Sequence, residues 1–152
     1  MFGHNSDNRP DHLTPVSLPD GTYLTKVASQ GSLVHGVDNN GNLWVWGSEI
    51  YAKNDEENFS KIYEGQFERE SQPMRMKWLQ EKNLQAIDVE CGRNSALVKC
   101  KDKNGDIVFY GLCQSEEQIA SIGGVARTSK VYNHFINKLD IDGNRVVDFA
   151  MT

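Results

Sequence analysis

The sequence predicts an all-β protein made of repeated antiparallel units, and three observations lead to this fold class. A pattern of strand, polar turn, strand and aromatic-Gly pair occurs twice along the 152 residues. Both copies turn at an Asn-Gly pair, which is the strongest short signal for a β-hairpin. The runs on either side of each turn are rich in β-branched and aromatic residues, which suit the partly buried surface of a sheet.

The two copies can be aligned on their first strands and on their turns. The first covers residues 27–47 and turns at Asn40-Gly41; the second covers 89–111 and turns at Asn104-Gly105. The second copy is two residues longer, and the addition lies before its turn. We expect a type I′ turn at each pair, with positive φ at both central residues.

The second strand of the first hairpin is expected to be covered on both faces. Trp44 and Trp46 alternate with Leu43 and Val45, so both sides of this strand are apolar. A strand of this kind lies between two layers of structure.

A proline-containing segment precedes each hairpin, at residues 14–18 and 72–79. Proline is tolerated at the start of an edge strand, so we expect a fourth strand in each unit. Four antiparallel strands per unit are typical of a β-propeller blade. Phe2-Gly3 supplies a further aromatic-Gly pair, and 146–152 is similar to the first strand of another copy. The expected units are approximately 2–47, 46–111 and an incomplete 110–152, in one domain covering 1–152.

The repeat resembles the regulator of chromosome condensation family. The resemblance is carried by Val89-Glu90-Cys91-Gly92, by the two Asn-Gly turns and by Phe2-Gly3-His4-Asn5, and it extends over about two and a half units. It implies consecutive four-stranded blades of a seven-bladed β-propeller. Because so few blades cannot close a ring, we expect the others to come from the same, longer polypeptide or from a partner chain.

The segment 48–72 between the two copies is long and acidic, with seven acidic and three basic residues. Its aromatic residues lie at near-helical spacing. The segment has two interpretations, and in both a short Gly/Ser loop is expected to replace it without loss of the fold. One is a solvated loop with one helical turn pinned to the blade. The other is an acidic, aromatic insert that binds a partner. The candidate partner-binding residues are Glu56, Glu57, Phe59, Tyr63 and Phe67.

The loop after the second hairpin, 112–133, is expected to begin a short helix at a capping Ser115 and to end it at Gly123-Gly124.

Composition limits the classes of partner and compartment. The net charge is −5, which does not favour nucleic-acid binding. The chain has no apolar run long enough to span a membrane, and its first ten residues lack a signal-peptide pattern. Its three cysteines, Cys91, Cys100 and Cys113, are expected to be unpaired buried thiols, which indicates an intracellular protein, cytoplasmic or nuclear.

No local motif indicates catalysis or cofactor binding. The stretches 38–42 and 140–144 have a superficial likeness to a calcium loop, but their glycine is fourth rather than sixth, and we interpret them as turns. The histidines are interpreted as structural or solvated residues: His4, His12, His35 and His134. We therefore expect no catalytic, metal or cofactor site, and no intrinsic enzymatic activity.

The leading functional hypothesis is a non-catalytic scaffold that binds another protein within a larger protein or assembly. The resemblance leaves two alternatives open: part of a guanine-nucleotide exchange factor for a small GTPase, or the partner-binding propeller of a ubiquitin ligase. No functional residue of either class can be carried over to matching positions in this chain.

Overall fold

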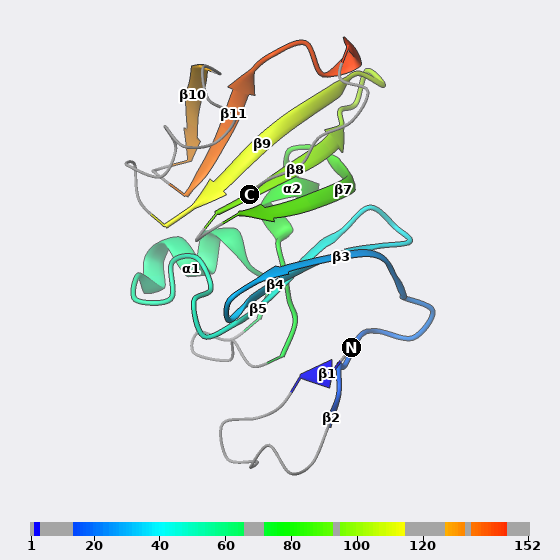
Figure 1. The fold of residues 1–152 in the computed structure, drawn as a ribbon, viewed down its shortest axis with the longest axis vertical. Helices are drawn as coiled ribbons and strands as arrows, with labels where there is room; N and C mark the ends of the chain where they lie inside the picture. The colour runs from blue at the N-terminus through cyan, green and yellow to red at the C-terminus, as the bar shows by residue number, and fades with distance from the viewer. Residues whose placement is uncertain are drawn as a thin grey trace.

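The computed structural model describes residues 2–3, 14–65, 72–92, 95–114, 127–132 and 135–145. The protein is mostly β, with a four-stranded and a five-stranded antiparallel sheet, a short two-stranded ladder and few helices (Figure 1). The strands are β1 (Phe2–Gly3), β2 (Thr14–Pro15), β3 (Leu24–Gln30), β4 (Leu33–Asp38), β5 (Leu43–Gly47), β6 (Met74–Arg75), β7 (Gln85–Gly92), β8 (Ser95–Lys101), β9 (Ile107–Cys113), β10 (Arg127–Tyr132) and β11 (Ile136–Asp140). The helices are α1 (Glu56–Ile62), α2 (Lys77–Glu81) and the 3₁₀ turn η1 (Gly143–Arg145).

Both predicted hairpins are present. The first sheet has the order β3-β4-β5-β6, and its β4–β5 hairpin turns at Asn40-Gly41. The second has the order β10-β11-β9-β8-β7, and its β8–β9 hairpin turns at Asn104-Gly105. The first hairpin contains five residue pairs and the second contains seven, so the longer second copy extends the ladder.

The first strands of the two sheets are also equivalent. The pairing of β3 with β4 shifts between Leu24 and Lys26, and that of β7 with β8 shifts between Ala86 and Asp88. Each strand therefore carries a bulge of one residue just before the valine on which the two copies align. The sequence alignment and the strand register agree at this point.

The two turns differ from the predicted type. Gly41 and Gly105 have φ of +81° and +83°, whereas neither preceding asparagine has a positive φ. In the first turn the Gly41 N–H donates to the Asp38 carbonyl at 3.3 Å, and the Asp38 N–H donates to the Asn42 carbonyl at 3.0 Å. This is a three-residue loop in which a type I turn is followed by a glycine bulge. The prediction of type I′ was wrong because it took no account of the aspartate that precedes each turn.

The proline-containing segment closes the preceding sheet rather than opening the next one. The short strand β6 pairs with β5, so the strands of the first sheet lie between residues 24 and 75 and cross the limits of the sequence repeat. The strand expected over 72–79 is limited to Met74–Arg75. Lys77–Glu81 is helical instead, and this turn buries Trp78 and Leu79 against the core.

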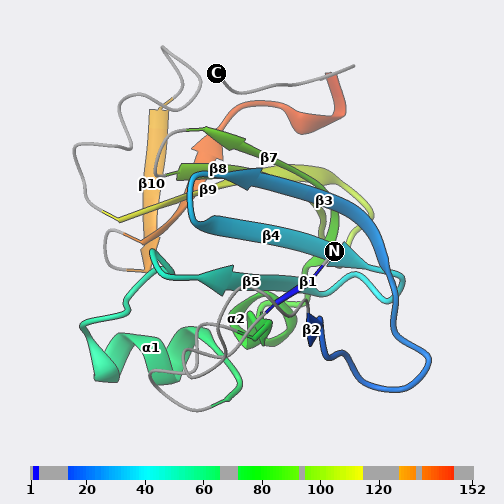
Figure 2. The same cartoon turned by 60° about the horizontal axis from the view of Figure 1, so that its bottom comes forward.

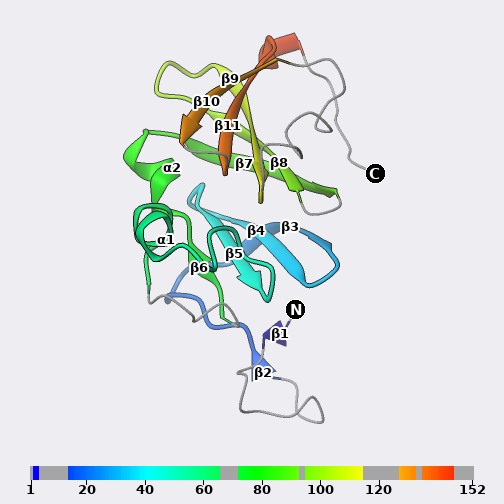
Figure 3. The same ribbon diagram turned by 90° about the vertical axis from the view of Figure 1, so that its left-hand side faces the viewer.

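The main core lies between the two sheets, which meet through β3 and β4 on one side and β7 on the other (Figure 3). Val45 faces this core, while Trp44 and Trp46 point to the opposite face of the first sheet. All four apolar residues of β5 are buried. The predicted coverage of this strand on both faces is therefore confirmed.

The segment after β5 is part of this core. Helix α1 confirms the helical spacing seen in the sequence, and the Asp55 carboxylate caps it by accepting the Asn58 N–H at 3.2 Å. The apolar side chains that the structure describes in this segment are at most 3% exposed: Ile50, Tyr51, Ala52, Phe59, Ile62 and Tyr63. Figure 2 shows α1 near β5 and α2, on the side of the first sheet away from β3. The expected helical turn pinned to the sheet is present, since α1 buries Phe59 and Ile62. The expectation that a Gly/Ser loop could replace the segment without loss of the fold is wrong, because the buried side chains fill space that water would otherwise enter.

Other expectations fall on residues that the structure does not describe. They are the helix expected from Ser115 to Gly123-Gly124 and the strand expected over 146–152. Among the described residues, no helix has the length and apolar character needed to cross a membrane.

The burial of α1 leads to a stability prediction. Phe59→Ala should lower the free energy of unfolding by about 3–5 kcal/mol, because it leaves a cavity under the helix. The control is Glu56→Ala in the first turn of the same helix, where the side chain is exposed and the change should stay within about 0.5 kcal/mol. Urea unfolding followed by circular dichroism measures both. Equal effects of the two substitutions would contradict the core assignment.

Candidate functional site

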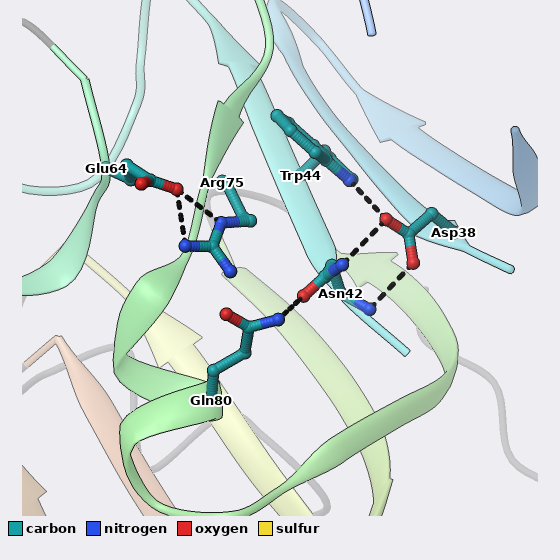
Figure 4. Close-up of polar contacts among 6 residues, drawn as sticks. All are labelled: Asp38, Asn42, Trp44, Glu64, Arg75 and Gln80. Carbon is teal, nitrogen blue, oxygen red and sulfur yellow. Dashed lines mark hydrogen bonds and ion pairs between the residues drawn. The ribbon is translucent and has the colours of Figure 1, made fainter. Parts of the chain in front are cut away.

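The turn of the first hairpin is organised by a buried carboxylate. Asp38 is 3% exposed, and its Oδ1 accepts the backbone N–H of Asn40 at 2.8 Å and of Asn42 at 2.9 Å. Its Oδ2 accepts from Asn42 Nδ2 at 3.0 Å and from the Trp44 indole Nε1 at 2.8 Å (Figure 4). Four donors around one carboxylate fix the turn and the start of β5 together.

These hydrogen bonds decide the protonation state of Asp38. Burial alone would raise the pKa of this carboxyl, but the donors from Trp44, Asn42 and Asn40 outweigh it. The pKa of Asp38 is therefore lowered from its ordinary 3.8. The group is ionised at neutral pH, which is the state that accepts all four bonds.

The second turn repeats part of this arrangement. Asp102 Oδ1 accepts the backbone N–H of Asn104 at 2.9 Å and of Asp106 at 3.0 Å. The residue that corresponds to Trp44 is Val108, whose side chain has no hydrogen-bond donor. The shared motif is thus Asp-x-Asn-Gly with a polar fifth residue, and its mechanism is the aspartate bridging two backbone amides.

Helix α2 and the start of β7 are tied to the first turn. Gln80 Nε2 donates to Asn42 Oδ1, and the Ala86 N–H donates to the Gly41 carbonyl at 2.9 Å. Asn83, with φ of 57°, lets the chain leave α2 and enter β7. The first turn, α2 and the beginning of the second sheet therefore form one connected edge.

An open groove lies along this edge between the two turns. Its volume is about 570 Å³. It is lined by both turns and by the segment from α2 to β7: Asn40, Gly41, Gln80, Asn83, Leu84, Gln85, Lys101, Asp102, Lys103 and Gly105. Four of these residues carry side-chain amides, which both donate and accept hydrogen bonds. A groove of this chemistry suits the alternating N–H and C=O groups of an extended peptide.

The candidate partner-binding residues of the segment 48–72 are not brought together on the surface. Glu56 and Glu57 are exposed on α1, and Glu57 pairs with Lys61 at 3.2 Å. Phe59 and Tyr63 are both 1% exposed, and their ring centroids lie 4.7 Å apart in the core. Because they are buried, these rings are not available to a partner. The sequence did not predict this, since helical spacing alone does not show whether an apolar face meets the core or the solvent. Phe67 lies outside the described residues.

The second calcium-like stretch fastens the chain to the second hairpin. The Ile107 N–H donates to Asn144 Oδ1 at 3.0 Å, and Asn144 Nδ2 donates to Asp106 Oδ1 at 3.4 Å. The Asn144 N–H donates to Asp142 Oδ1 at 3.1 Å. These bonds describe a docked turn, and within the described residues no group of three potential ligands is close enough to hold a metal ion.

One polar cluster crosses the interface between the sheets. His35 Nδ1 lies 3.0 Å from Cys91 Sγ, and His35 Nε2 lies 2.9 Å from the Tyr51 hydroxyl. Cys91 is on β7 and His35 on β4, 56 positions apart, and no motif in the sequence pointed to their contact. The interpretation of His35 as a structural residue agrees with this position, because the ring is fully buried.

The electrostatics of this cluster do not suit nucleophilic catalysis. Burial lowers the pKa of His35 to about 3, and burial, with a smaller effect of Glu90, raises the pKa of Cys91 to about 12. At neutral pH the pair is therefore thiol and neutral imidazole, whereas a nucleophilic cysteine needs its thiolate. The cluster instead provides hydrogen-bond partners for polar groups within the interface.

Comparison with known proteins gives no family assignment, since no protein-family model and no curated protein sequence matches this chain.

The two aspartates make a matched pair for a stability measurement. Asp38→Asn should lower the free energy of unfolding by about 2–3 kcal/mol at pH 7, because the amide nitrogen would replace an oxygen that accepts two of the four donors. Asp102→Asn should cost less, because two N–H groups reach only one oxygen of that carboxylate. Urea titrations of both variants give the comparison, and a larger loss for the Asp102 variant would refute the assignment.

The stability difference between the wild type and Asp38→Asn should also depend on pH. Because the pKa of Asp38 is lower in the folded protein than its ordinary 3.8, its contribution is complete above that value and is lost as the pH falls through the folded pKa. The gap in stability between the wild type and Asp38→Asn should therefore be constant near neutrality and close under acid. Unfolding titrations across that range measure the gap.

The cysteines lead to a third prediction. Burial raises the pKa of Cys100 to about 12 and that of Cys113 to about 11, as it does for Cys91. Thiol titration of the native protein at neutral pH should be slow for all three. In denaturant without reductant it should count three thiols per chain. A count of one would reveal a disulfide.

Proposed function

We propose that the chain is a segment of a β-propeller whose two sheets are successive blades, and that it serves as a non-catalytic scaffold for binding another protein within a larger protein or assembly. The observation that carries the proposal is the connected edge, on which two equivalent turns and α2 enclose a polar groove. The resemblance to regulator of chromosome condensation repeats is part of the same proposal.

The arrangement of the sheets supports the propeller. The equivalent first strands, β3 and β7, are in contact, and each sheet continues outward through a hairpin to a later strand. Both sheets also carry apolar residues on the face turned away from the main core. These are Trp44 and Trp46 on the first sheet, and Leu97, Phe109, Cys113 and Leu139 on the second. Blades that pack between two neighbours need apolar residues on both faces.

The groove supports a binding role. Recognition residues are often carried on loops that a rigid scaffold positions. Here the turns are fixed by Asp38 and Asp102, whereas the side chains of Asn40, Asn83 and Gln85 are exposed. Fixed backbone and exposed amides give a partner's main chain a set of hydrogen-bonding groups that lose little freedom on binding.

A peptide-display selection on the folded chain tests the proposal. Selected peptides should perturb the amide resonances of the two turns and α2. The double variant Asn40→Ala/Gln85→Ala should weaken their binding about thirtyfold, because each of the two lost hydrogen bonds contributes about 1 kcal/mol. Lys138→Ala, on an exposed position of β11, is the matched control and should have no effect. A selection that gives no binder, or binders that perturb only other surfaces, would overturn the proposal.

A further inference from the structure

A second hollow, smaller than the groove, lies between α1 and α2. Its volume is about 280 Å³, and it is lined by Ser60, Lys61, Lys77, Trp78, Glu81 and Lys82. We call it the lysine notch. Trp78 is 2% exposed, and Lys82 Nζ lies 5.8 Å from the centroid of its ring. This cation–π contact restrains Lys82 at the edge of the notch before any ligand arrives.

The charge of the notch is opposite to that of the whole chain. Three lysines and one glutamate line it, whereas the net charge of the protein is −5. Lys61 is paired with Glu57. Within the described part of the chain, Lys77 and Lys82 form no ion pair with a carboxylate. Two ammonium groups without an ion-pair partner among the described residues thus line one small hollow, together with the carboxylate of Glu81.

The notch and the groove are both lined by residues of α2. Glu81 lines the notch and Gln80 lines the groove, so the helix is shared by both. On the far side of the groove, Lys101 and Lys103 are also exposed. An extended segment that crosses α2 would therefore meet lysines at both ends and amide side chains between them.

We propose that the lysine notch binds an acidic side chain of an extended, acidic segment in a partner protein. The inference rests on the proposed scaffold function and adds the chemistry of the partner. A carboxylate would accept hydrogen bonds from Lys77 and Lys82, and charge-assisted bonds of this kind are about twice as strong as neutral ones. Glu56, Glu57 and Glu81 lie on α1 and α2 and would repel a continuous polyanion. They favour a peptide with separate charges over a nucleic acid.

Fluorescence anisotropy with synthetic peptides tests the site. The probes are a labelled peptide of Glu, Asp, Ser and Gly, and its counterpart in which Gln and Asn replace the acids. The acidic peptide should bind more tightly than the neutral one, and added salt should weaken it. Lys77→Gln/Lys82→Gln should reduce its affinity about tenfold or more. Lys138→Gln should leave the affinity unchanged, and Lys82→Arg should retain most of it, since the charge is kept.

Several outcomes would overturn the inference. They are equal binding of the two peptides, undiminished binding by the Lys77→Gln/Lys82→Gln variant, and tighter binding of a labelled single-stranded oligonucleotide than of the acidic peptide. The peptide selection separates this failure from failure of the scaffold function. Selected binders that have no acidic residues and are unaffected by the two lysine substitutions would support the scaffold function but contradict the proposed role of the notch. A selection without binders, together with equal binding of the acidic and neutral peptides, would contradict both the scaffold function and the notch.

Discussion

The structure depends on filling the space between the two sheets. β3 and β4 reach β7 directly, but neither sheet alone can bury the apolar side chains it turns inward. The segment after β5 and helix α2 supply the missing volume through Phe59, Tyr63 and Trp78. A close-packed interior tolerates few voids, so these connections are as necessary as the strands they join. The groove and the notch exist because α2 is held in place by this packing.

Local chemistry explains what the sequence could predict. Each Asn-Gly pair predicts a turn from a few neighbouring residues. The strand Leu43–Gly47 is apolar on both faces, and this pattern predicts its burial. The turn type could also have been predicted, because Asp38 and Asp102 stand where a carboxylate reaches two backbone amides. In each of these cases the residues that determine the structure lie close together in the chain.

Contacts between distant residues explain what it could not predict. The contact of His35 with Cys91 follows from the packing of two sheets, and no sequence motif around either residue predicts it. The spacing of Phe59 and Tyr63 predicted a helix, but an apolar face looks the same whether it meets a core or a partner. The groove likewise combines residues from two turns and a helix, so it became visible only with the fold.

The offset between the sequence repeat and the sheet has a consequence for how such units can be gained or exchanged. A crossover at the aromatic-Gly pair would join β3–β5 of one protein to the β6 of another, so the edge strand and α2 would arrive with the incoming unit. The Met76 N–H, which donates to the Leu43 carbonyl at 2.8 Å, would then have to find its acceptor in a foreign neighbour. Recombination would therefore join the two units through the hydrogen bonds between β5 and β6. Selection for good pairing would then act on the sequences of both units.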